Sequence, residues 1–321
     1  MGKTSNLKKG KAGIFIITIG IILVIYSLLM ILLVVWGFNT SLKYRSDFHS
    51  PGNNVIGLPD FSWLAKTNIS LFQNYIDVIN GLEIKGRAES YYTIFSDEPV
   101  RHPLNADFDD VVWNTISYVI FSAIVQTLVP AVVGYMCAKY RYKFSEIVYV
   151  TALVIMMIPI VGTAPAELKL LKDLALYDTL IGNLIQKFNF TGMYFFVFYA
   201  FFQSVPDSYQ EAAEIDGASQ FRILTLIMMP LAIKMLSTVF LLRAVFYWNE
   251  YQGVLMYLPT RPTFAYAIYD LAFNNNQSGY GLQTTPARIA GTMLLTLPLL
   301  IVFIIFKDKL MGNVSLGGLK G

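Results

Sequence analysis

Long apolar segments are the feature that most constrains how this chain can fold. The first extends from Ile14 to Trp36 without a charged residue, and about 20 such residues in a helix cross the hydrocarbon core of a bilayer. Charged residues make up 14% of the chain, against about 25% in soluble domains. The chain is therefore predicted to be an all-α polytopic membrane protein with six transmembrane helices, the other five at 111–138, 147–166, 180–202, 226–258 and 289–306.

Polar residues and prolines interrupt several of these segments. The run Gln186-Lys187-Phe188-Asn189 breaks the fourth segment. A proline within a helix removes a backbone donor and kinks the helix, and neighbouring helices can satisfy the freed carbonyls. We therefore expect kinked transmembrane helices near Pro130, Pro159, Pro230 and Pro298.

The distribution of positive charge predicts the orientation of the chain in the membrane. Cytoplasmic segments carry an excess of Lys and Arg. With the N-terminus inside, the inner segments hold more of these residues than the short outer segments do, at Lys3, Lys8, Lys9, Lys11, Lys139, Arg141, Lys143, Arg222, Lys307, Lys309 and Lys320. We expect both termini to lie in the cytoplasm.

Three regions follow from this topology. Residues 1–36 form the N-terminus and the first transmembrane helix, and residues 37–110 form an outer loop region. Residues 111–321 form the transmembrane core, which ends in a cytoplasmic tail at 307–321 that is rich in glycine over 312–321. The outer region is long for a loop, so we expect it to contain some structure of its own.

Several chemistries are excluded by the sequence. Cys137 is the only cysteine, so the chain has no intrachain disulfide and no cysteine-only metal site. It contains no GxxxxGK[ST] motif, so we expect it to bind no ATP itself. A net charge of +3 is too small to indicate a nucleic-acid partner. We predict no catalytic residue and no metal ligand on this chain.

The inner segment from Ser204 to Pro230 predicts a short helix that docks onto a partner. Pro206 suits the first turn of a helix, and a glycine at position 217 suits the left-handed residue that ends one. Ser219 can then cap the next helix. We expect a helix of about three turns over 206–217, followed by a tight turn and a second helix that enters the membrane.

One face of this helix is predicted to meet the partner. At helical spacing, one side presents Tyr209, Ala212, Ala213 and Asp216. The alanines permit a close approach, and Glu211 and Glu214 could meet basic residues of the partner. This arrangement favours docking into a groove on the cytoplasmic side.

The same segment resembles the EAA loop of binding-protein-dependent ABC importer permeases, whose pattern is EAA-x3-G-x9-I-x-L-P. Met229 stands where that family usually has Leu, and the other positions match: Glu211, Ala212, Ala213, Gly217, Ile227 and Pro230. Further segments resemble the shorter permease of maltose-type sugar importers within the carbohydrate ABC transporter permease family. They include Asn74-Tyr75, Asn114-Thr115, Trp248-Asn249-Glu250 and the terminal Gly317-Gly318-Leu319-Lys320-Gly321.

This resemblance implies a type I ABC importer permease fold and a subunit that forms half of a pathway for oligosaccharides. It implies a heterodimer with a longer homologous permease, an ATPase dimer that carries ATP and Mg, and an extracytoplasmic solute-binding protein. It implies that the chain spans a bacterial cell (inner) membrane, where it contacts membrane lipid. It also implies that the chain binds no cofactor of its own. The residues expected to couple to the ATPase are Glu211, Ala212, Ala213, Asp216, Gly217 and Pro230.

Arg243 lies near the middle of the fifth apolar segment. A central arginine costs roughly 2.5–3.5 kcal/mol on insertion scales, so it should face a cavity or a partner. It could pair with a carboxylate of the longer permease. It could instead contact substrate and favour acidic saccharides, together with Tyr247, Asn249 and Glu250. These four are the predicted substrate-pathway residues.

The outer loop 258–287 is the predicted contact with the solute-binding protein. It begins with Thr260-Arg261-Pro262 and contains a polar run from Asn274 to Gly279. The resemblance implies that this loop can reach the sugar site of the docked protein. A solvated connection between two spans is the alternative.

Two other functions compete with that of an importer subunit. A secondary sugar transporter driven by an ion gradient usually shows inverted repeats and intramembrane carboxylates, but only Glu250 qualifies here and no repeat is visible. A membrane-anchored receptor would use residues 37–110 as its sensor. That region is poor in core residues, and six spans would be excessive for an anchor.

Overall fold

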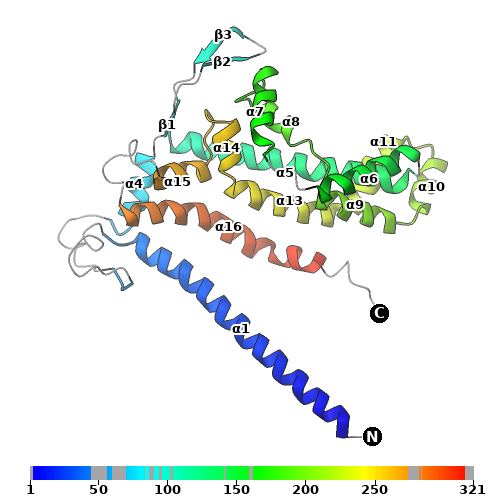
Figure 1. Cartoon of the computed structure of the whole chain (residues 1–321), viewed down its shortest axis with the longest axis horizontal. Coiled ribbons are helices and arrows are strands. Elements are labelled where there is room, and N and C mark those ends of the chain that lie inside the picture. Colours follow the sequence, from blue (N-terminus) through cyan, green and yellow to red (C-terminus); the bar gives the residue numbers. More distant parts are fainter. Residues whose placement is uncertain are drawn as a thin grey trace. The chain divides into compact units, whose positions relative to one another are not determined.

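A computed structural model gives the structure of the chain (Figure 1). It describes residues 3–44, 56–59, 70–82, 84–86, 90–93, 96–101, 104–140, 142–158, 162–273, 282 and 284–314. Two units can be distinguished, and each is described by itself. The first comprises Met1–Leu82 with Ser278–Thr296, and the second comprises Glu83–Gln277 with Leu297–Gly321.

The first unit is built on the long helix α1 (Lys3–Ser41) and the short helix α4 (Gln73–Gly81). The Asn74 side-chain amide donates hydrogen bonds of 2.8 Å to the carbonyls of Ser41 and Lys43, and the Ser41 hydroxyl lies 2.6 Å from the Tyr75 hydroxyl. Carbonyls at the end of a helix have no partner within the helix, so Asn74 satisfies the Ser41 carbonyl at the end of α1 and the Lys43 carbonyl just beyond it. Partial burial of the Tyr75 ring raises the pKa of its hydroxyl, and the hydrogen bond with Ser41 partly offsets this.

Helix α1 exposes its apolar side chains along its length, from Phe15 to Phe38. A surface of this kind is stable only in lipid or against another helix, because backbone groups in a helix are satisfied internally and the side chains need an apolar surrounding. The predicted first transmembrane helix is confirmed as a continuous apolar helix over Phe15–Ser41.

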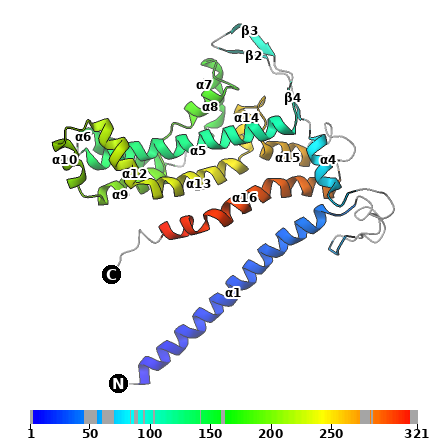
Figure 2. The same ribbon diagram turned by 180° about the vertical axis from the view of Figure 1, so that it is seen from behind.

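The second unit is organised around α5 (Phe108–Lys139). This helix lies beside α9 (Met193–Ser204) and α13 (Ile233–Asn249) in both views (Figures 1 and 2). At Gly134 a Cβ atom would lie 3.0 Å from the Tyr199 backbone nitrogen and 3.2 Å from the Phe195 carbonyl oxygen. Glycine is therefore required where α5 and α9 meet, because a larger residue would push the two backbones apart.

The core of this unit lies where α5, α9 and the start of α13 converge. Its largest members are aromatic, with Tyr135 in edge contact with Phe202 at a ring-centroid distance of 5.3 Å. The buried residues of this core are Ala131, Tyr135, Ala138, Phe198, Phe202, Ala213, Ile223, Met228, Ala232, Leu236 and Val239.

The two ends of this unit carry different elements. Helices α10 (Ser208–Ile215) and α11 (Gln220–Ile223) lie at the end where α5 finishes. The other end carries α7 (Ala164–Asp173), α14 (Gln252–Tyr257) and α15 (Phe264–Phe273), as Figure 1 shows. The predicted inner and outer loops are thus separated by the length of α5.

The described residues contain fewer candidate spans than the six that the sequence predicts. Three helices are long and apolar enough to cross a membrane, at Phe15–Ser41, Phe108–Lys139 and Thr285–Lys307 of α16 (Thr285–Val314). A fourth candidate is the pair Gln220–Leu231 and Ile233–Asn249, which is bent by 75°.

The third and fourth apolar segments do not form continuous helices. The third contains most of α6 (Lys143–Met157) and the start of α7, and Pro159 between them lies outside the described residues. The fourth is divided into α8 (Leu180–Gln186) and α9, and Lys187 and Phe188 lie in the break between them. The polar interruption expected there is confirmed.

The fifth segment was expected as one helix over 226–258, and this was wrong. A π-helix, η1 (Leu224–Met228), and the short α12 (Met229–Leu231) precede the bend at Ala232, and α13 ends at Asn249 before α14 begins. Pro230 lies in α12 beside the bend, as expected of a residue without a backbone donor. By contrast, α5 and α16 continue through Pro130 and Pro298.

Part of the outer region forms strands, which the all-α expectation did not include. Strand β1 (Ile84–Gly86) pairs antiparallel with β4 (Leu104–Ala106), and β2 (Ser90–Thr93) pairs antiparallel with β3 (Ser96–Arg101). The inner pair is nested in sequence within the outer pair. Structure of its own was expected in this region, but sequence periodicity did not identify its type.

Replacing Gly134 by Leu should disrupt the contact between α5 and α9. Overpacking of this kind costs roughly 1–3 kcal/mol, so the detergent-solubilised protein should unfold at a lower temperature. Gly20→Leu is the matched control, because no atom of the described residues lies within 4 Å of a Cβ placed at Gly20. Equal melting temperatures for the two variants would contradict this account of the α5–α9 contact.

Candidate functional site

The predicted docking helix is α10, and it is shorter than expected. It spans Ser208–Ile215, 8 residues, rather than 206–217. Asp207 is its N-cap residue, so Pro206 lies before the helix and not in its first turn. The helix is about two turns long.

Gly217 ends the docking helix as the sequence predicted. Its φ is +73°, in the left-handed region that favours glycine. The Ala218 amide donates to the Ala213 carbonyl at 2.9 Å, and the Gly217 amide donates to the Glu214 carbonyl at 3.0 Å. These two bonds define a Schellman motif, which satisfies carbonyls that the last turn leaves unpaired.

The four residues expected on one docking face are divided between two surroundings. Ala213 is buried in the core of its own chain, so it fixes α10 against α5 and α9 and cannot meet a partner. Tyr209, Ala212 and Asp216 are exposed, as are Glu211 and Pro230. The side chain of Ile215 is 86% exposed. The outer surface of α10 is therefore a small apolar area with carboxylates around it.

A buried lysine holds the start of α10. The Lys139 ammonium at the end of α5 lies 2.6 Å from an Asp207 carboxylate oxygen and donates to the Val205 carbonyl at 2.5 Å. Only 2% of the Lys139 side chain is exposed, against 59% for Asp207. Sequence reasoning used Lys139 only as a topology marker and missed this contact.

A second set of hydrogen bonds joins α10 to the following helix. The Glu214 carboxylate accepts from the Gln220 side chain at 2.9 Å and from the Gln210 side chain at 3.0 Å. These bonds hold the pKa of the Glu214 carboxyl below its usual range, so it stays charged at neutral pH. Ser219 caps α11 as predicted, since its hydroxyl accepts from the Arg222 amide at 3.4 Å.

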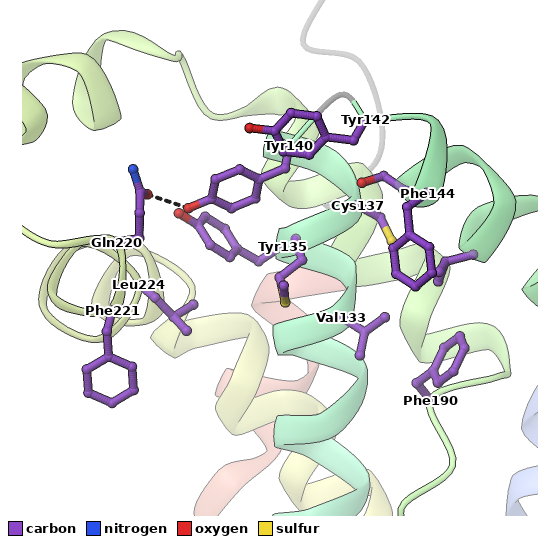
Figure 3. A pocket seen from close by; sticks show the side chains of 13 residues that line it. Val133, Tyr135, Cys137, Tyr140, Tyr142, Phe144, Phe190, Gln220, Phe221 and Leu224 are labelled. Atoms are coloured by element: carbon purple, nitrogen blue, oxygen red, sulfur yellow. Dashed lines mark hydrogen bonds between the residues drawn. The ribbon is translucent and has the colours of Figure 1, made fainter.

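An apolar pocket of about 670 Å³ lies beside this region, between the end of α5, the start of α6 and α11 (Figure 3). The Tyr140 hydroxyl donates to the Gln220 side-chain oxygen at its edge. The side chains around it are Val133, Tyr135, Met136, Cys137, Tyr140, Tyr142, Phe144, Ser145, Val148, Phe190, Gln220, Phe221 and Leu224. The apolar periodicity of these segments did not predict a pocket.

Replacing Lys139 by Met should loosen the start of α10, because the substitution keeps a long apolar stem and removes the ammonium. Loss of a hydrogen bond to a charged group costs roughly 1.5–3 kcal/mol, so amides 205–211 should exchange with solvent about tenfold faster. Lys143→Met is the control, since Lys143 is exposed at the first residue of α6. Unchanged exchange in Lys139→Met would contradict the anchoring role.

A second pocket, of about 360 Å³, lies toward the opposite end of the unit. Charged and amide side chains line it together with apolar ones, and we call it the polar pocket. It lies among α5, α7, α8, α13 and α14. Its walls are formed by Tyr118, Gln126, Ala164, Glu167, Gln186, Lys187, Asn189, Phe246, Tyr247, Glu250, Gln252, Gly253, Met256 and Tyr257. Two of the predicted pathway residues, Tyr247 and Glu250, belong to it.

Lys187 is the central cation of this polar pocket. Its ammonium lies 4.5 Å from the ring centroid of Tyr247 and 5.1 Å from that of Tyr118. The two rings meet edge to face at 5.7 Å. The Lys187 carbonyl accepts from the Gln126 side chain at 2.7 Å, which fixes the break between α8 and α9 against α5.

Two carboxylates face the same pocket. One oxygen of Glu167 accepts from Gln186 at 2.7 Å and from the Tyr257 hydroxyl at 3.1 Å. One oxygen of Glu250 accepts from the Gly253 amide at 2.7 Å and so caps the start of α14. Sequence reasoning missed Glu167 and Lys187, although an ionisable residue in or beside an apolar segment is itself a signal.

The other two predicted pathway residues do not line this pocket. The Arg243 guanidinium lies 4.5 Å from the ring centroid of Tyr194 on α9, and its buried Nε atom has no hydrogen-bond partner among the described residues. Asn249 is exposed and donates to the Val245 carbonyl of its own helix at 2.9 Å. The structure therefore brings together only half of the predicted set.

The three residues of the predicted binding-protein contact differ in their surroundings. The Thr260 amide donates to an Asp178 carboxylate oxygen at 3.1 Å, and Pro262 is buried, with its carbonyl accepting from Asn114 at 3.4 Å. Arg261 alone of the three is exposed. The polar run predicted from Asn274 to Gly279 lies outside the described residues.

Comparison with known families and curated proteins gives the following similarities. Residues 130–313, more than half of the chain, match the family model described as "Binding-protein-dependent transport system inner membrane component". The chain is 29% identical over 223 residues to "Putative ABC transporter permease protein ORF2" of Caldicellulosiruptor sp. (strain Rt8B.4), covering 68% of this chain and 78% of that one. It is 26% identical over 209 residues to "Arabinooligosaccharides transport system permease protein AraQ" of Bacillus subtilis (strain 168), covering 65% and 73%.

A solved structure shares the fold. It is a bacterial ABC transporter involved in the import of the acidic polysaccharide alginate, and one of its chains matches with a TM-score of 0.67 and 22% sequence identity. The match covers 92% of this chain and 96% of that one. The arrangement of helices around α5 is thus one that an ABC importer also uses.

Proposed function

Because the chain belongs to the family of binding-protein-dependent transport system inner membrane components, we propose that this permease subunit serves an ATP-driven importer of oligosaccharides. Coupling of this subunit to an ATPase is supported by one observation. The outer surface of α10 is exposed, at the end of the unit opposite the polar pocket. The substrate class rests on relatives such as the arabinooligosaccharide permease.

The docking helix is the proposed contact with a separate ATPase dimer, which binds the ATP and Mg. Its exposed Ile215 and Tyr209 supply apolar contact area, and Glu211 and Asp216 supply charge for a basic partner. Gly217 sets the turn after it, and Pro230 lies near the bend that leads into α13. This chain itself is proposed to bind no cofactor.

The remaining partners follow from the same function. A longer homologous permease would complete the pathway and cover apolar surface that this chain leaves exposed, and a solute-binding protein would deliver the saccharide on the outer side. The chain lies in a bacterial cell membrane in this proposal, with both termini cytoplasmic. The segments on the same side as the termini hold more Lys and Arg than the short segments on the other side, which supports that orientation.

The substrate pathway is proposed to pass the outer half of α13. Tyr247 and Glu250 line the polar pocket there, Asn249 is exposed beside it, and Arg243 lies one to two turns further along the same helix. Arg243 would face the longer permease or the substrate, because its guanidinium is too costly to leave in lipid.

The direct test is reconstitution of the chain with its genomic neighbours. The proposal expects an ATPase subunit to co-purify with the chain and labelled arabinotriose or maltotriose to accumulate in proteoliposomes only when ATP is present. Accumulation driven by a proton or sodium gradient without ATP would support the secondary-transporter alternative instead.

Gly217→Val and Glu211→Lys should impair transport while membrane insertion stays intact. Valine at a φ of +73° costs roughly 1 kcal/mol or more, and lysine reverses the charge offered to the partner. ATPase co-purification should fall about tenfold for each variant, as a loss of roughly 1.4 kcal/mol implies.

Gly162→Val is the matched control for the glycine variant. Gly162 has a φ of +83°, and in the part of the chain that the structure describes a Cβ there has no atom within 4 Å, as is also true at Gly217. The two substitutions therefore impose similar backbone strain, but only one affects the docking helix. Equal losses of ATPase co-purification in both would argue against a docking role for α10.

Arg261 should contact the solute-binding protein. In a variant that carries Cys137→Ser and Arg261→Cys, crosslinks to the binding protein should form in the ATP-trapped complex. Lys172→Cys in the same background is the control, since Lys172 is exposed on α7 at the same end of the unit. Crosslinking at 172 but not at 261 would show that the loop after α14 is a passive connection.

A further inference from the structure

The charges of the polar pocket indicate what it can bind. The ionisable residues that line it, besides its tyrosines, are Glu167, Lys187 and Glu250, and Arg243 is directed at Tyr194 instead. With both carboxylates charged, these three residues carry a net negative charge. The Arg243 guanidinium outside the pocket also acts electrostatically on Lys187 and Tyr247. Its charge and that of Lys187 together offset the two carboxylates, so the pocket has no excess of positive charge that would favour acidic groups.

Lys187 is held in place but keeps hydrogen-bonding capacity. Its contacts within the pocket are with the rings of Tyr118 and Tyr247, and it makes no ion pair among the described residues. An ammonium has three hydrogen-bond donors. The face of an aromatic ring attracts the ammonium electrostatically, but it is not a conventional hydrogen-bond acceptor such as an oxygen. The lysine can therefore donate to a ligand hydroxyl without first breaking an ion pair.

The two carboxylates supply complementary acceptors. The hydrogen bonds from Gln186 and Tyr257 to Glu167 use one of its oxygens, and the hydrogen bond from Gly253 to Glu250 likewise uses one. Each carboxylate therefore has a second oxygen that can accept from a ligand. The half-exposed ring of Phe246 and the side chain of Met256 add apolar wall. Charged donors, charged acceptors and an aromatic surface together match a ring that carries several hydroxyls.

The size of the pocket limits the ligand further. Small-molecule pockets span roughly 300–1,000 Å³, and this one, at about 360 Å³, lies near the lower limit. We infer that the polar pocket is a subsite of this subunit for one uncharged sugar ring, bound by Lys187 as donor and by Glu167 and Glu250 as acceptors. This inference rests on the proposed function and names the part of the substrate that this subunit contacts.

The inference also removes the bias toward acidic saccharides that Arg243 led us to expect from the sequence. The deciding observation is where the charges lie. The two carboxylates line the pocket and oppose the charge of the guanidinium, which packs over a ring outside it.

The test uses the reconstituted complex with its ATPase and binding protein. Uptake of labelled maltotriose and of the corresponding tri-uronic acid is measured for the wild type and for Lys187→Met, Glu250→Gln and Glu167→Gln. Lys187→Met should raise the KM for maltotriose about tenfold, because a charge-assisted hydrogen bond is lost. The two Gln variants should increase uptake of the acidic trisaccharide relative to the neutral one.

Lys172→Met is the matched control. The Lys172 ammonium also lies over a tyrosine ring, 4.7 Å from the centroid of Tyr177, but it does not line the pocket. Its KM should equal that of the wild type. Assembly is followed by co-purification of the ATPase, which all of these variants should retain, and Lys172→Met should also keep the basal ATP hydrolysis of the wild type.

Three negative outcomes are distinguishable. If the wild-type complex takes up no saccharide with ATP, the proposed function is wrong, and the subsite fails with it. If the wild type takes up maltotriose but Lys187→Met keeps its KM and the Gln variants keep the same neutral-to-acidic ratio, the subsite inference alone is overturned. If Lys187→Met loses the ATPase subunit, Lys187 is structural and the inference is again overturned.

Discussion

At Gly134 the backbones of α5 and α9 approach so closely that the Tyr199 nitrogen would lie 3.0 Å from any Cβ. This contact determines where the other parts of the unit lie. With α9 against α5, the rings of Phe198 and Phe202 fill the core, and Ala213 of the docking helix packs into the same core. Glycine is the residue that permits this, because side chains of ordinary size would separate the helices.

Breaks in the apolar segments impose a common physical requirement. Backbone groups in a membrane must be bonded internally or line a cavity, so an interrupted helix needs partners for the groups it frees. Gln126 supplies one partner at the break after α8, and the Glu250 side chain supplies another at the start of α14. Both residues line the polar pocket, so the pocket lies where the helices are interrupted.

The docking helix and the polar pocket are connected through continuous elements. Lys139, at one end of α5, holds Asp207, and Tyr118, toward the other end of the same helix, contacts the pocket lysine. Helix α13 likewise begins beside the bend at Ala232 and reaches the pocket at Tyr247. A displacement of the docking helix must therefore be absorbed at the Lys139 contact or transmitted to α5.

The sequence by itself determined the helical membrane class, the interruption at 186–189, the turn at Gly217 and the cap at Ser219. Each of these depends on local chemistry, namely apolar length, backbone conformation or a neighbouring hydroxyl. Only the tertiary structure separated Ala213 from the docking surface, divided the fifth segment at Ala232 and placed Lys187 between two tyrosines from different helices. Those outcomes depend on contacts between residues far apart in the chain, such as Glu167 with Tyr257, which periodicity along one segment does not encode.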